Sequence, residues 1–230
     1  MKRFYKDVSA AQVEGGWQVT LDRRGIKTVK GSQQVVPSEA LAHALAAEWE
    51  AQGDKIDPAT LPLRDMTDYA IDIVAADPPS LVEKLLSYGD TDTLLYRADP
   101  DEPLYARQQE VWEPVVAAFE ARHGVELVRV SGIMHRPQIE ATFATLREYL
   151  AAHSPYALAG IEAMVSLAAS LVVGLEASAA DADALALWQA ASLEEDWQAD
   201  LWGRDEEAEE RRTKRTADFL KACEFVRLSR

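Results

Sequence analysis

Residues 185–203 have the sequence LALWQAASLEEDWQADLWG, which is typical of an amphipathic helix. With 3.6 residues per turn, one face of that helix gathers apolar side chains and one carboxylate, namely Leu187, Ala190, Ala191, Glu194, Trp197 and Leu201. The other acids, Glu195, Asp196 and Asp200, turn away from this face. Glu194 must therefore have a buried partner, lie at the edge of a crevice, or belong to a surface that another molecule covers.

Helical periodicity extends outward from this stretch over most of the chain. Turn and cap signals divide it into expected helices at about 65–76, 78–88, 103–122, 137–152, 156–178, 181–202 and 204–225. Within this region the sequence ELVRVSGI, at 126–133, is rich in β-branched residues. These residues favour either a short strand or an extended connection.

The first 36 residues have a different pattern, with short alternating runs separated by Gly15-Gly16 and by the charged tip before Gly25. Such punctuation is typical of hairpins. Ser38 then caps a helix that ends near Gly53, and the two prolines of residues 56–65 indicate a linker. We therefore predict an α+β protein. A small β-rich N-terminal domain with one helix, 1–58, is followed by a larger all-helical C-terminal domain, 59–230.

Composition limits the partners and the compartment. A formal charge of −15 argues against nucleic acid, because phosphate binding needs a basic field. Cys223 is the single cysteine, so no internal disulfide is possible. The apolar stretch 157–175 contains Glu162 and small polar residues, which indicates a buried helix without membrane insertion. With no secretory signal at residues 1–10, we expect a cytoplasmic protein.

Sequence motifs for catalysis are not evident. The four histidines lack metal-ligand spacing, and no glycine-rich phosphate loop is present, so we expect neither a metal nor another cofactor. Cys223 has the surroundings of a core residue. Glu194 could act as an acid or base with a second carboxylate such as Asp65, Asp68, Asp90 or Asp92, form a structural ion pair with an arginine, or contact a protein partner. Three of six tryptophans lie near it, which suits either a core or an interface.

Several stretches together resemble one known family, the Atp12 assembly chaperones of the F1 ATP synthase and their bacterial relatives. The resemblance is carried by KRFYKDV at 2–8, GWQVTLDRRGIKT at 16–28, LAHALAAEWEAQ at 41–52, DYAID at 68–72, DTLLYR at 92–97, QQEVWEP at 108–114 and LEEDWQADLWG at 193–203. Each motif is short, but their common order covers most of the chain.

The resemblance implies a two-part protein that binds the free α subunit of F1 ATP synthase and prevents its aggregation before assembly with the β subunit. It implies that the acid opening the LEE motif, Glu194, is functionally essential. It also points to Trp49, Asp92 and Arg97 as structural positions within the family motifs. Without a presequence, the chain resembles a bacterial member.

We accordingly expect a non-enzymatic, ATP-independent chaperone, acting as a monomer, whose client contacts Glu194, Trp197, Leu201 and Trp202. Release would follow from competition by the β subunit. Two other interpretations are kept. A small-molecule hydrolase would use Glu194 in a cleft between the domains, and a general holdase would protect unrelated unfolding proteins equally well.

Overall fold

The computed structural model describes residues 1–132, 134–203 and 205–230. Its order of strands followed by helices is that of the expected α+β class. The chain forms two compact units. The first comprises Met1–Pro78, His153–Gly160 and Glu224–Arg230, and the second comprises Pro79–Ala152 and Ile161–Cys223. The division into domains at 1–58 and 59–230 stays a prediction. The boundary between these expected domains differs from the boundary between the two compact units.

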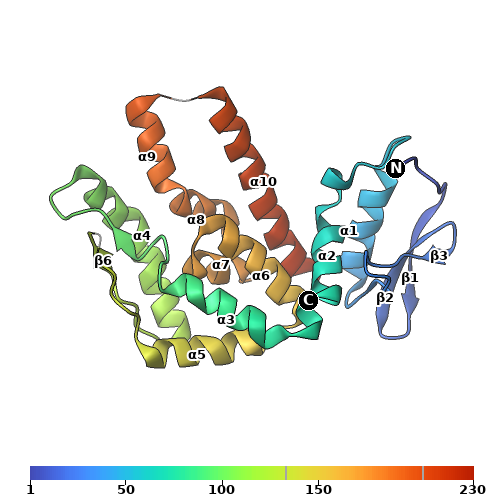
Figure 1. Cartoon of the computed structure of the whole chain (residues 1–230), viewed down its shortest axis with the longest axis horizontal. Coiled ribbons are helices and arrows are strands. Elements are labelled where there is room, and N and C mark those ends of the chain that lie inside the picture. Colours follow the sequence, from blue (N-terminus) through green and yellow to red (C-terminus); the bar gives the residue numbers. More distant parts are fainter. Residues whose placement is uncertain (133, 204) are drawn as a thin grey trace. The chain divides into compact units, whose positions relative to one another are not determined.

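The first unit is built on an antiparallel sheet and one helix (Figure 1). Strands β1, Val8–Val13, and β2, Gly16–Leu21, form a hairpin whose turn has Gly15 at φ +87°, a conformation that glycine adopts without strain. Short strands β3, Arg24–Gly25, and β4, Val35–Val36, both pair with the far side of β2. Helix α1, Glu39–Glu50, packs on β1 and β2 and buries its apolar face there.

The boundary of α1 follows the sequence expectation. Ser38 has an extended backbone, and its Oγ accepts the N–H of Leu41 at 3.0 Å, as an N-cap does. Leu41 and Leu45 are fully enclosed against the sheet. This helix and its sheet form one part of the core of the first unit.

The prediction of a linker at residues 56–65 is wrong. This segment contains a 3₁₀ turn, Pro58–Thr60, and the start of helix α2, Pro62–Asp72, which a second 3₁₀ turn, Val74–Ala76, follows. Leu61 and Leu63 are buried, so the segment belongs to the core. The carboxylate of Glu48 accepts the N–H groups of Leu63 and Arg64 at 2.8 and 3.0 Å. A residue of α1 thus caps α2, a long-range contact that the two prolines do not reveal.

The regular secondary structure in the remainder of the described chain is helical apart from two short strands. The helices are α3, Pro78–Gly89; α4, Pro103–His123; α5, Glu140–Ala151; α6, Pro155–Ala168; α7, Leu171–Ser178; α8, Ala184–Ala191; α9, Leu193–Trp202; and α10, Glu206–Leu228. The expected helix 204–225 begins on a residue outside the described part. Within the described residues, none of the helices combines the length and apolarity needed to cross a bilayer.

Two expected helices are each divided in two. The expected helix 156–178 is interrupted at Ala169, which has φ +48°, and Ser170 then caps α7 by accepting the N–H of Val173 at 3.0 Å. The expected helix 181–202 is interrupted at Ser192, which ends α8 and precedes α9 with its ψ at +4°. Serine competes with the helical backbone for hydrogen bonds and favours helix ends, which accounts for both breaks.

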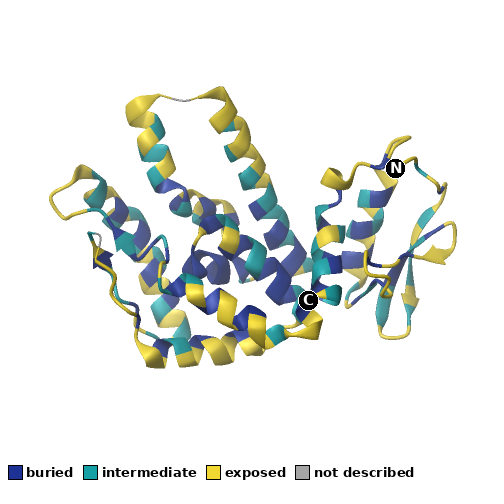
Figure 2. Cartoon of the chain, in the orientation of Figure 1, coloured by how far each residue is buried: buried dark blue, intermediate teal, exposed yellow. Residues whose placement is uncertain are grey.

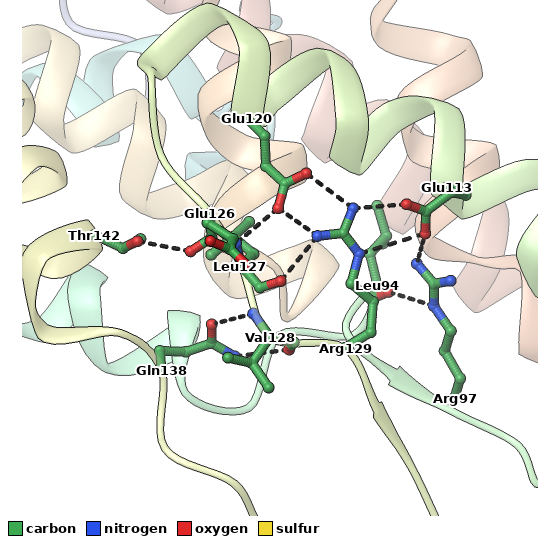
Figure 3. Close-up of polar contacts among 10 residues, drawn as sticks. All are labelled: Leu94, Arg97, Glu113, Glu120, Glu126, Leu127, Val128, Arg129, Gln138 and Thr142. Carbon is green, nitrogen blue, oxygen red and sulfur yellow. Dashed lines mark hydrogen bonds and ion pairs between the residues drawn. The ribbon is translucent and has the colours of Figure 1, made fainter.

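The segment expected at 126–133 to be a strand or an extended connection contains a strand. Strand β6, Val130–Ser131, pairs in parallel with β5, Tyr96–Arg97; residue 133 lies outside the described part. Arg129, just before β6, places its guanidinium between the carboxylates of Glu113 and Glu120 on α4, with an Nη2–Oε1 distance of 2.7 Å to Glu113 (Figure 3). Bidentate charge-assisted contacts of this kind fix both distance and orientation.

Candidate functional site

The candidate site lies at the start of α9, where three acids occupy the first helical turn. Glu194, Glu195 and Asp196 follow Ser192 there, close to the partially positive helix N-terminus, which favours negative charge. Glu195 forms an ion pair with Arg215 of α10 at 2.7 Å, and Asp196 forms one with Arg212 of the same helix. The charges of these two acids are therefore matched within the second unit.

Glu194 is bound differently. Its Oε1 accepts a hydrogen bond of 2.7 Å from Nε2 of Gln108, a residue of α4 with no exposed surface. The Oε1 of Gln108 in turn accepts the N–H of Ala98 at 2.8 Å. This second bond fixes the orientation of the amide, so its NH₂ must face Glu194. The carboxylate of Glu194 is thereby held by a neutral donor.

The environment of Glu194 alters its acidity. Partial burial raises the pKa of its carboxyl above the usual range, and the hydrogen bond from Gln108 only partly offsets this effect. Among the described residues Glu194 has no ion pair. The structural ion pair considered for this residue is therefore not found there. A half-buried carboxylate without a cation is a group that a partner's positive charge would stabilise.

Glu194 also faces open space. It lines a pocket of about 410 Å³ together with Tyr96, Arg97 and Gly132, and a second of about 200 Å³ with Trp188 and Arg215. Residues of the second unit alone form both pockets. Asp99 and Glu102 line the larger one, so the carboxylates beside Glu194 are not the Asp65, Asp68, Asp90 or Asp92 considered from the sequence.

The aromatic and aliphatic residues of α9 differ in exposure. Trp197 is half-buried and lines a pocket of about 430 Å³ with Leu193 and Arg212. Leu201 and Trp202, at the end of the helix, expose 63% and 86% of their surface, and Figure 2 shows this last turn in yellow. The expected apolar stripe thus continues past the core. Two large apolar side chains are left in contact with water, at a cost in free energy that covering them would remove.

Asp92 and Arg97, both singled out from the sequence, are enclosed in the second unit. The carboxylate of Asp92 accepts the N–H groups of Leu94 and Val172 at 3.0 and 2.9 Å, and the hydroxyl of Ser170 at 2.7 Å. Asp92 therefore caps α7 from outside the helix. The guanidinium of Arg97 forms an ion pair with Glu113 at 2.7 Å, which joins β5 to the Arg129 cluster (Figure 3).

Trp49 lies in the core of the first unit. It is 9% exposed and stacks edge-on with Tyr5, with ring centroids 5.8 Å apart. The hydroxyl of Tyr5 donates to the carbonyl of Trp49 at 2.7 Å. These contacts fix Trp49 within the packing of the first unit, and the structural role that the family resemblance implied for it stays a prediction.

Gln108 is the residue of the site that sequence reasoning missed. It opens the family motif QQEVWEP at 108–114, but no local pattern in that stretch of α4 separates it from its neighbour Gln109. Only the packing of α4 against the start of α9 identifies it.

Within the described residues, no group of three or more His, Cys, Asp or Glu side chains could hold a metal ion.

Comparison with known proteins gives one consistent result. The model of the ATP12 chaperone protein family matches residues 2–120. Protein atp12, mitochondrial, of Schizosaccharomyces pombe is 30% identical over an alignment of 224 residues, and the match covers 91% of this chain and 76% of that protein. The chain belongs to the ATP12 chaperone family.

Solved structures of the family agree with this assignment. The crystal structure of Atp12 from Paracoccus denitrificans matches all of this chain and 98% of its own, with 35% identity and a TM-score of 0.93. A protein of Agrobacterium tumefaciens matches all of this chain and 86% of its own, with 37% identity and a TM-score of 0.95. The family is the one that the sequence motifs resemble, the assembly chaperones of ATP synthase.

Proposed function

We propose that this protein is an ATP-independent chaperone that binds the free α subunit of F1 ATP synthase and prevents its aggregation before assembly with the β subunit. Membership of the ATP12 family is the observation that carries the proposal. An unassembled subunit exposes apolar surface meant for its neighbour, and a transient cap on that surface stops self-association. We further propose that the protein acts as a cytoplasmic monomer and is not an enzyme.

The proposed client contact is the α9 surface, which we define as Glu194, Trp197, Leu201 and Trp202. Spacings of three, four and seven residues place Glu194, Trp197 and Leu201 on one face of the helix. Trp202 and Leu201 supply exposed apolar area, and tryptophan is enriched at the centres of protein interfaces. The carboxylate of Glu194 would make a charge-assisted contact with an arginine or a backbone N–H of the client.

Release of the client from the chaperone requires a contact of moderate strength. A chaperone that hands on its client needs fast dissociation more than tight binding, and related complexes differ mostly in their dissociation rates. Competition by the β subunit for the same α-subunit surface would then free the chaperone. No nucleotide is required in this scheme.

The test is capture of purified F1 α subunit by the native chain, by Glu194→Gln and by Glu195→Gln as a control. Glu194→Gln keeps the hydrogen bond from Gln108 but removes the charge. We expect it to lose capture and the ability to prevent aggregation. Glu195→Gln should retain both, because that acid is already paired with Arg215. Equal capture by all three proteins would rule out the proposed role of Glu194.

Two alternatives predict other results in the same assays. A general holdase would protect an unrelated unfolding protein as well as the α subunit. A hydrolase would turn over an ester or glycoside and lose that activity with Glu194→Gln. The pocket of about 410 Å³ at Glu194 is also lined by two neighbouring carboxylates, Asp99 and Glu102, a feature that such an enzyme would share.

A further inference from the structure

The first unit has a pocket of its own, of about 550 Å³, which the proposed function does not use. We call it the basic pocket. Its lining combines aromatic or apolar side chains with cations, among them Phe4, Tyr5, Arg24, Ile26, Lys27 and Trp49. This volume lies within the range of protein sites that bind small molecules or a few side chains of a peptide.

The cations of the basic pocket are available. Arg24 and Lys27 are exposed, and neither has an ion pair among the described residues. Asp22, the acid in the lining, already accepts the N–H groups of Lys6 and Asp7 at 3.0 and 2.9 Å. The guanidinium of Arg64 is likewise occupied by Asp65 and Asp68. Arg24 and Lys27 therefore bring positive charge to the pocket without a side-chain ion pair, and only Arg24 also attracts the carboxylate of Asp22.

The stretch that supplies most of the pocket lining has a charge opposite to that of the whole chain. Residues 1–30 contain seven Lys and Arg against three Asp and Glu, whereas the full sequence has a net charge of −15. Clefts lined by one sign of charge concentrate ligands of the opposite sign. Such a local excess of positive charge favours an anionic ligand. The rest of the chain is acidic and would instead attract a basic ligand.

The aromatic side of the pocket is held in place but partly uncovered. Phe4 exposes 64% of its surface and meets Tyr5 edge-on, with centroids 5.3 Å apart. Tyr5 is fixed by its hydrogen bond to the carbonyl of Trp49 and by the guanidinium of Arg3 over its ring at 4.6 Å. A rigid aromatic wall offers contact area at little cost in conformational entropy.

We propose that the basic pocket binds an acidic peptide segment of a partner protein. An apolar side chain of that segment lies against Phe4, Ile26 and Trp49, while its carboxylates contact Arg24 and Lys27. Two cations without an ion pair, beside apolar side chains, suit a short acidic peptide better than nucleic acid, which needs a longer run of positive charge. This site is separate from the α9 surface, so it does not rest on the proposed client contact.

The test selects from a displayed library of short random peptides with the full-length protein. Two variants are compared with the native chain. Arg24→Glu with Lys27→Glu reverses the charge of the basic pocket, and Lys2→Glu with Lys55→Glu makes the same change at exposed lysines outside its lining. We expect the native chain to enrich acidic peptides that carry an apolar residue. The pocket variant should bind them at least about tenfold more weakly, and the control variant should bind them within about twofold.

Further measurements establish whether the basic pocket itself holds the selected peptides. Circular dichroism and melting temperature show that both variants are folded, and Phe4→Ser gives a second, uncharged change in the pocket that should also weaken binding. Enrichment of neutral or basic peptides, or equal loss in both charge variants, would overturn the proposal. So would tighter binding of a single-stranded oligonucleotide than of the selected peptides. Capture of F1 α subunit is measured with the pocket variant as well. Because the α9 surface is unchanged in that variant, capture should persist, which separates the two sites.

Discussion

The amide Nε2 of Gln108 donates a hydrogen bond of 2.7 Å to Oε1 of Glu194, and the same amide accepts the N–H of Ala98 at 2.8 Å. A helix, a loop and the start of a second helix thus meet at one neutral side chain. The bond lowers the pKa of Glu194, while burial raises it more. Because the donor carries no charge, the carboxylate stays unneutralised in the free protein.

Replacing Gln108 with leucine should therefore affect both stability and acidity. The change leaves the N–H of Ala98 and the half-buried carboxylate of Glu194 without their partner, and each lost partner of this kind costs about 1–3 kcal/mol. We expect a lower free energy of unfolding in urea. NMR titration should give a pKa for Glu194 higher than in the native protein. An unchanged or lower pKa would contradict the described hydrogen bond.

Trp202→Ala should leave stability nearly intact, within about 0.5 kcal/mol, since the side chain is 86% exposed. Capture of the client should weaken if the α9 surface is the contact. Trp188→Ala is the matched comparison on the preceding helix. That indole is 2% exposed and donates to the hydroxyl of Thr216 at 2.8 Å. Its removal should cost about 3–5 kcal/mol in chemical unfolding.

Arg129→Met should lower the free energy of unfolding by about 1–3 kcal/mol, because two half-buried carboxylates lose their cation. Burial alone would raise the pKa of Glu113, but the contacts of Arg129 and Arg97 outweigh it and hold that pKa below its usual value. The variant should therefore raise the pKa of Glu113, measured by NMR titration. Arg147→Met, which breaks an exposed pair with Glu83, should change stability by less than about 1 kcal/mol.

Local patterns in the sequence predicted the parts of the fold that local chemistry determines. The glycine turn at Gly15 defined the first hairpin, and Ser38 defined the start of α1, because each acts through its own backbone or hydroxyl. The breaks at Ala169 and Ser192 were missed. Both lie inside long apolar runs whose helical period continues across the break, so periodicity alone cannot show where the chain turns.

The candidate site was predictable only where it depends on local spacing along the chain. The position of Glu194 on an apolar face was evident from spacing, and so was the apolar stripe through Leu201. The partners were not. Gln108 is 86 residues away in sequence, and the cations that pair with Glu195 and Asp196 lie on a later helix. Contacts of that range depend on tertiary packing, which a single sequence does not encode as a local pattern.

Asp92 should give the protein a measurable dependence of stability on pH. Burial raises the pKa of its carboxyl from 3.8 to about 6, although the donors of Val172, Ser170 and Leu94 act in the opposite direction. The folded state then binds a proton more tightly than the unfolded state, so the contribution of Asp92 to stability is fully present below about pH 4. It is lost as pH rises through about 6, by up to ~3 kcal/mol. In Asp92→Asn this loss is absent, and the difference in unfolding free energy between native and variant protein should decrease over that interval. A difference that grows with pH would show that the carboxylate is instead stabilised by its hydrogen-bond donors.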